Sequence, residues 1–189
     1  MSGDPAEARA IMVDSQVRPN DVPDLAIQDA MRQVAREALL GADKRHLAYA
    51  DTEAEYAPGR WLLRPRDVAK LLYALRPRAG ETALAISSPY AAAVLEAMGL
   101  TVTRRDAADA SPIVGAYDVV VCEGAVTTAP AEWRGVLAPG GRLGVVERDG
   151  PVGHAVLYLR SGDGAGARVL FDCTPPMMAG FQTAPAFAF

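Results

Sequence analysis

Residues 117–122 constrain the fold more than any other segment of the chain. They read Tyr-Asp-Val-Val-Val-Cys and end in an unbroken apolar run. A strand that is half exposed alternates apolar and polar residues, whereas a continuous apolar run is typical of a strand buried on both faces of a parallel sheet. Parallel neighbours need long crossover connections, so the surrounding chain should alternate strands with helices.

The flanking segments show this alternation. Residues 81–86, 100–105 and 142–147 each predict a short strand, and the last of these follows a Pro-Gly-Gly turn. Ser88-Pro89 predicts a helix start and Met98-Gly99 its end, while residues 130–137 predict a short helix. Residues 154–160 and 168–172 flank a Gly-rich turn and predict an antiparallel hairpin. The order indicates an α/β fold with a mostly parallel sheet, helices on both faces and an antiparallel end.

The first part of the chain has helical patterns instead. Asn20, Asp21 and Asp24 are N-cap residue types ahead of apolar positions at helical spacing, and Gly41 is placed to end that helix. After a polar stretch at 42–59, a second helix is expected over 65–75, with proline in its first turn. We expect one domain over 1–189, with a helical part at 1–78 and the sheet core at 79–189.

Composition excludes several classes of function. The net charge of −4, with no basic stripe, argues against nucleic acid or an anionic membrane as partner. Residues 1–10 lack the apolar block of a signal peptide, and no stretch is long enough to span a membrane, so we expect a cytoplasmic protein. Cys122 and Cys173 are expected to be buried, reduced thiols, although a single disulfide stays open. His46 and His154 have no metal-ligand spacing, so no metal is expected.

Several segments resemble the protein-L-isoaspartate O-methyltransferase family, which belongs to the class I S-adenosylmethionine-dependent methyltransferases. Residues 12–21 (MVDSQVRPND) are similar to a bacterial branch of that family. Further similar segments are DAM at 29–31, AYAD at 48–51, RP at 64–65, YDVVV at 117–121 and LAPGGRL at 137–143. The resemblance implies a Rossmann-like fold, S-adenosylmethionine as cofactor, and repair of isoaspartyl residues by carboxyl methylation.

The centre of the chain departs from the family. There, the first strand ends in an acidic residue followed by a GxGxGY loop, whose glycines let the backbone approach the cofactor. In this chain Ala85 stands at the acidic position, Ser87 at the first glycine, and only Tyr90 matches the loop. Pro89 also removes an N–H group that a ligand could have used.

Three further departures point the same way. The residue at the family's ribose-binding carboxylate is Arg105, with Asp106 one place later, where a loop position could still reach a hydroxyl. Only the 11 residues 106–116 precede Tyr117, whereas a βαβ unit takes roughly 30 residues, so one βα unit is missing and strand 100–105 becomes a sheet edge. Leu63 replaces the family's serine near the methyl group, and its side chain cannot hydrogen-bond a carboxylate.

Two hypotheses follow, and the residues leave open whether the chain is an enzyme. The first is a degenerate, catalytically impaired family member that needs no cofactor. It would act as an interaction or scaffold protein, binding a protein partner or its own copy through the exposed edge. The alternative is an active S-adenosylmethionine-dependent carboxyl methyltransferase with a displaced cofactor site, in which Tyr90, Asp106 and Glu123 would contact the cofactor.

Overall fold

The computed structural model describes residues 4–162 and 164–182. The helices are α1 (Pro5–Met12), α2 (Leu25–Gln33), α3 (Pro65–Leu75), α4 (Pro89–Ala97) and α5 (Ala131–Gly135). The strands are β1 (Ala54–Ala57), β2 (Arg60–Leu62), β3 (Thr82–Ile86), β4 (Thr101–Arg105), β5 (Tyr117–Val126), β6 (Leu137–Arg148), β7 (Gly153–Ser161) and β8 (Gly164–Asp172). Short π or 3₁₀ turns occupy Val13–Val17, Arg18–Asn20, Arg36–Leu39 and Arg45–Leu47.

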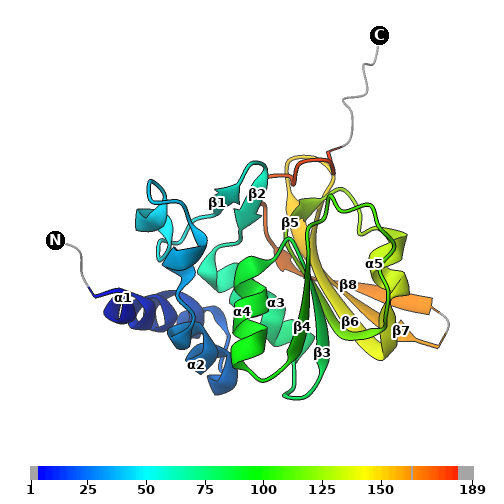
Figure 1. The fold of residues 1–189 in the computed structure, drawn as a ribbon, viewed down its shortest axis with the longest axis horizontal. Helices are drawn as coiled ribbons and strands as arrows, with labels where there is room; N and C mark the ends of the chain where they lie inside the picture. The colour runs from blue at the N-terminus through cyan, green and yellow to red at the C-terminus, as the bar shows by residue number, and fades with distance from the viewer. Residues whose placement is uncertain (1–3, 163, 183–189) are drawn as a thin grey trace, which may run out of the picture.

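The main sheet has the expected plan. Its strand order is β4-β3-β5-β6-β7-β8, in which β4, β3, β5 and β6 are parallel and β7 and β8 are antiparallel (Figure 1). Residues 106–116 contain no helix or strand, and β4 pairs only with β3 within the described chain. The missing βα unit and the exposed edge position of residues 101–105 are therefore confirmed.

Both faces of the sheet are covered, but unequally. On one face α3 and α4 pack against the sheet, and α1 and α2 lie outside α4 (Figure 1). On the other face the described chain has one helix, the five-residue α5. Its Trp133 packs in a smaller core with Ile113 and Phe181. Helices on both faces are thus confirmed, with the bulk of the helical material on one of them.

Residues 34–62 differ from the expected pattern. Helix α2 begins at the Asp24 cap, whose carboxylate accepts the Ile27 N–H, but it ends at Gln33 because Val34 adopts an extended backbone. The chain then turns inward and buries Arg36. The apolar spacing that predicted a helix as far as residue 38 belongs in part to a separate 3₁₀ turn, Arg36–Leu39. The stretch at 42–59, expected to be irregular, contains β1, which forms a hairpin with β2.

The expectations for α3, α5 and the two cysteines were close to the structure. Helix α3 covers residues 65–75 as predicted, whereas α5 is shorter than predicted because residue 137 already begins β6. Cys122 and Cys173 are both free and buried, which excludes the disulfide. The described residues hold no group of three or more potential metal ligands. No helix among them is long and apolar enough to cross a membrane.

Candidate functional site

The candidate site lies where β3 and β4 end, next to the start of α4, the β1–β2 hairpin and Glu123 of β5. Ligands of open α/β sheets bind beyond the carboxyl ends of the strands, at this kind of position. A cavity of about 230 Å³ remains there. It is lined by Tyr56, Ala85, Ser87, Ser88, Pro89, Arg104, Arg105 and Asp106.

The turn between β3 and α4 keeps a backbone shape that favours glycine. Ser87 has a φ of 45°, in the left-handed region where non-glycine residues are uncommon. Its hydroxyl accepts the Ala107 N–H at 2.9 Å and donates to Asp106 at 3.4 Å. The serine at the family's glycine position is therefore held by the loop that follows β4.

Ser88 occupies the N-cap position of α4, as predicted, but its side chain does not cap the helix. Its hydroxyl donates to the Ile86 carbonyl at 2.8 Å and accepts the Glu123 N–H at 2.5 Å. Ser88 thus fastens the end of β3 to β5, and another group must satisfy the first N–H groups of the helix.

That group is the carboxylate of Glu123. Its Oε2 accepts the Tyr90 and Ala91 N–H groups at 3.2 and 3.3 Å, so a side chain from β5 caps the first turn of α4. Glu123 is fully buried, and this burial raises the pKa of its carboxyl to about 7 despite the opposing field of Arg36.

Arg36 is a second buried charge, close to the same helix start. Its guanidinium donates to the Leu63 carbonyl at 2.6 Å and lies 4.6 Å from the centre of the Tyr90 ring. Arg36, Tyr90 and Leu63 are all essentially inaccessible to solvent, and burial raises the pKa of the Tyr90 phenol. Arg36, Leu63 and Tyr90, which are far apart in the sequence, therefore pack together in the interior at the start of α4.

Asp106 has its own internal partner. Arg60 of β2 binds its carboxylate with two hydrogen bonds, of 3.0 and 3.3 Å, and also donates to the Ala179 carbonyl at 3.0 Å. The Arg60 hydrogen bond holds the pKa of Asp106 below its usual value. Bidentate pairs of this kind fix the geometry of both groups. Arg60 thereby ties together the β1–β2 hairpin, the loop after β4 and the C-terminal segment.

The structure brings the three predicted site residues to one end of the sheet but gives them structural partners. The Tyr90 N–H is bonded to Glu123, and Asp106 is bonded to Arg60. Cys122 is buried, and burial raises the pKa of its thiol, which fits a core residue rather than a nucleophile. Arg36 and Arg60 were not predicted as site residues, since neither lies in a motif with a recognised spacing.

Proteins similar in sequence to this chain include protein-L-isoaspartate O-methyltransferases. No protein-family model matches the chain. A protein-L-isoaspartate O-methyltransferase of Methylorubrum populi is 32% identical in an alignment that covers 80% of this chain and 84% of that protein. The enzyme of Methylorubrum extorquens is also 32% identical, over 82% of this chain and 80% of its own length.

Solved structures give the same fold. A Plasmodium falciparum protein assigned as a protein-L-isoaspartate O-methyltransferase, solved in complex with S-adenosyl-L-homocysteine, aligns with a TM-score of 0.70. The two share 16% sequence identity, and the alignment covers 90% of this chain and 97% of the other. The similarity to the Methylorubrum enzymes along most of both chains, with this shared fold, shows that the chain belongs to the protein-L-isoaspartate O-methyltransferase family.

Proposed function

We propose that this chain is a catalytically silent member of its family that acts by contacting another protein chain. The observation that carries the proposal is the Arg60–Asp106 pair, because it uses the one carboxylate near the family's ribose-binding position. A ligand hydroxyl would have to displace a bidentate arginine to reach Asp106.

The residues present do not fit S-adenosylmethionine. The Tyr90 and Ala91 amides, which begin α4, are bonded to Glu123, and Pro89 has no N–H to offer. The remaining cavity of about 230 Å³ is smaller than the roughly 300–1,000 Å³ of most small-molecule sites. We therefore derive no methyl-transfer step for this chain.

The substrate side supports the same conclusion. Leu63 stands where the family has serine, and its side chain is 1% exposed and packed in the core. An isobutyl group offers no hydrogen bond to a substrate carboxylate. Without these contacts, cofactor and substrate are not held in the geometry that methyl transfer between them requires.

The second candidate function is an active carboxyl methyltransferase with a displaced cofactor site. It is favoured by the gathering of Tyr90, Asp106 and Glu123 at one end of the sheet and by relatives that align over four-fifths of the chain. It would require Arg60 and Glu123 to release their present partners.

For the silent protein, the partner we propose is a second copy of the chain, bound along β4. The strand has no neighbour on its outer side among the described residues. Antiparallel pairing of β4 with its own copy across a two-fold axis would satisfy its free backbone groups.

A methyl-transfer assay tests the proposal. The purified chain is incubated with labelled S-adenosylmethionine and an isoaspartyl peptide, and the Methylorubrum populi enzyme serves as the positive control. We expect no transfer above the rate without protein, both for the unmodified chain and for Leu63→Ser, since the cofactor defect is separate. Turnover by the unmodified chain or by Leu63→Ser would support the second candidate function instead.

A further inference from the structure

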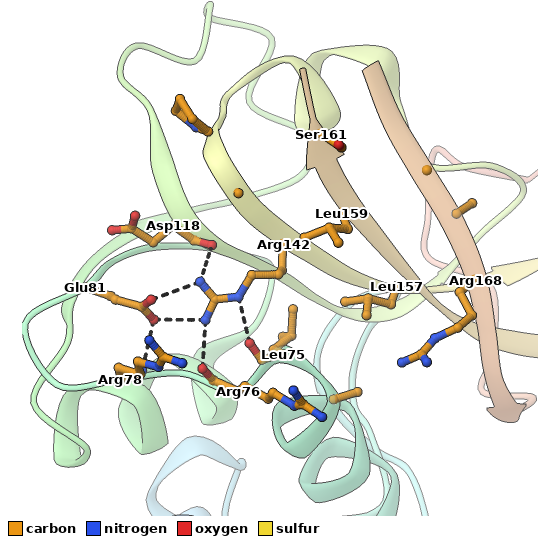
Figure 2. A pocket seen from close by; sticks show the side chains of 15 residues that line it. Leu75, Arg76, Arg78, Glu81, Asp118, Arg142, Leu157, Leu159, Ser161 and Arg168 are labelled. Carbon is orange, nitrogen blue, oxygen red and sulfur yellow. Dashed lines mark hydrogen bonds and ion pairs between the residues drawn. The ribbon is translucent and has the colours of Figure 1, made fainter. Parts of the chain in front are cut away.

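A second cavity, larger than the one at the candidate site, lies at the opposite end of the sheet. It measures about 780 Å³ and opens between the end of α3, the amino ends of β3, β5 and β6, and the β7–β8 hairpin (Figure 2). It is lined by Ala74, Leu75, Arg76, Arg78, Glu81, Asp118, Pro139, Gly140, Arg142, Leu157, Leu159, Ser161, Gly166, Ala167 and Arg168. Nothing in the preceding proposal uses this cavity.

The strand register explains the hollow. Leu159 lies opposite Gly166 on β8, and a glycine there leaves the sheet face without a side chain. A Cβ atom built on Gly166 would meet no other atom within 4 Å. Leu157 lies opposite Arg168, so the two leucines form an apolar floor with a cation beside it. Leu159 is 47% exposed, because α3 ends at Leu75 and does not reach over it.

One wall of the cavity is held together by hydrogen bonds within the protein. The Arg142 guanidinium donates to both carboxylate oxygens of Glu81 at 3.0 Å and to the carbonyls of Leu75 and Arg76 at 2.8 Å. The Asp118 carboxylate accepts the N–H and hydroxyl of Thr82 at 2.9 Å. The carboxylates of both acidic lining residues therefore already accept hydrogen bonds within the protein, and Figure 2 shows those between Arg142 and Glu81.

The other three arginines of the lining are free. The guanidinium groups of Arg76, Arg78 and Arg168 are in exposed residues and have no hydrogen bond or ion pair with any described residue. Arg76 and Arg78 follow the end of α3, and Arg168 comes from β8, so cations approach the leucine floor from two sides (Figure 2). Three unpaired cations at one cavity are a local positive field in a chain of net charge −4.

We propose that this cavity binds a small organic anion, with its carboxylate or phosphate held by the free arginines and its apolar part on Leu157 and Leu159. Guanidinium groups match the planar, bidentate geometry of both anionic groups. The volume lies within the range of small-molecule sites, and an apolar floor with a few convergent polar groups is their usual composition. The site is separate from the carboxyl end of the sheet and goes beyond the function proposed above.

Titration calorimetry with hexyl phosphate and hexanoate tests the proposal. We expect saturable binding of at least one of them with a Kd of about 1 mM or tighter, as is reasonable for ligands of this size. The better of the two identifies the preferred anionic group. Hexan-1-ol has only the apolar part of such a ligand and inorganic phosphate only the anionic part. Each should therefore bind at least about tenfold more weakly.

Variants locate the binding in the cavity. Arg168→Ala should weaken binding about tenfold, and Gly166→Leu should abolish it by filling space that is open in the structure. The matched control is Arg45→Ala, which removes an exposed arginine outside the cavity and should leave the Kd unchanged. Thermal unfolding of each variant shows that it is folded.

Three results would overturn the proposal. One is no saturable binding of either hexyl anion at 10 mM, about tenfold above the expected Kd. Another is equal binding of hexan-1-ol, which would show that the arginines do not contribute. The last is unchanged binding by folded Gly166→Leu together with an equal loss in Arg168→Ala and Arg45→Ala, which would place the anion elsewhere on the surface.

Discussion

Asp106 and Glu123 are carboxylates of the kind that could hold a ligand, and in this chain each holds a part of the protein itself. Glu123 caps α4, and Asp106 is fixed by Arg60, whose side chain is only 8% exposed. Ser87 keeps the left-handed backbone of a glycine position although its side chain now bonds Ala107. Both carboxylates and the Ser87 hydroxyl therefore form contacts within the protein.

The Arg60–Asp106 pair should be measurable as a coupling energy. In a double-mutant cycle with Arg60→Ala and Asp106→Ala, we expect a coupling of about 1 kcal/mol, because the pair is bidentate and Asp106 is partly exposed. Urea unfolding of the four proteins gives the value. Additive effects of the two substitutions would show that Arg60 does not hold Asp106, and that the carboxylate is available to a ligand.

Glu123 should make stability depend on pH. Burial raises its pKa from 4.5 to about 7 in the folded protein, so the folded state binds this proton more tightly than the unfolded chain does. The contribution of Glu123 to the free energy of unfolding is therefore largest below pH 4.5 and falls as the pH rises towards 7. Because a shift of one pKa unit corresponds to about 1.4 kcal/mol, the total loss in the free energy of unfolding is about 3 kcal/mol.

Glu123→Gln isolates this effect, since an amide oxygen can still accept the two α4 N–H groups but does not ionise in this range. We expect the stability of this variant relative to the unmodified chain to be greater at pH 8 than at pH 5, by up to about 3 kcal/mol. Urea unfolding at both pH values measures it, with the exposed Glu7→Gln as control. A relative stability that is the same at both pH values would contradict the assigned pKa.

Among the elements, the edge strand β4 has the clearest consequence. The Thr101 N–H and the Arg105 carbonyl are bonded to the β3 side, so the backbone groups of Val102 and Arg104 point away from the sheet. Arg105 holds the following loop through the carbonyls of Asp109 and Ser111. No backbone hydrogen bond within the described chain joins residues 106–116 to that outer side of β4.

Proline at an outward-facing position tests pairing between copies. Arg104→Pro removes one outward N–H but no bond to β3, and proline is tolerated on edge strands. We expect a dimer for the unmodified chain and for Arg104→Ala, which loses the side-chain contacts with Glu96 and the Pro89 carbonyl but keeps its backbone N–H. We expect a folded monomer for Arg104→Pro. Light scattering of the three proteins decides this. A monomeric unmodified chain would rule out the second copy as partner.

Elements with a strong local signal were predictable. Helix α3 has apolar residues at helical spacing after a proline, and β5 has its continuous apolar run, so local patterns fixed both. The end of α2 was not predictable, because the same spacing continued beyond Val34 in a separate turn. The β1–β2 hairpin is held by a short antiparallel pairing within a polar stretch, which leaves little periodicity to detect.

Across the whole molecule, the site residues divide in the same way. Tyr90 and Asp106 were predicted from their positions relative to the family's motifs, and the structure brings them to one end of the sheet with Glu123. Arg36 and Arg60 contact groups 27 and 46 residues away, and no local pattern predicts such partners. Those partners decide whether the carboxylates are free, so the sequence predicted which residues gather at this end of the sheet but not which groups they bind.

The two ends of the main sheet therefore differ in the space and in the free charged groups that they offer to a ligand. The carboxyl end of the sheet has a cavity of about 230 Å³ and internally bonded carboxylates, whereas the amino end has a cavity of about 780 Å³ with free arginines. We therefore expect that the carboxyl end of the sheet does not accept the cofactor of the family.

Titration calorimetry with S-adenosyl-L-homocysteine tests this claim most directly, with the Methylorubrum populi enzyme as the comparison protein. Arg60 and Glu123 occupy the groups that a cofactor would need, so we expect no saturable heat from this chain at ligand concentrations up to about 100 μM, which corresponds to roughly −5.5 kcal/mol of binding free energy. Saturable binding with a Kd below about 100 μM, lost on Asp106→Ala, would contradict the account and restore an active cofactor site.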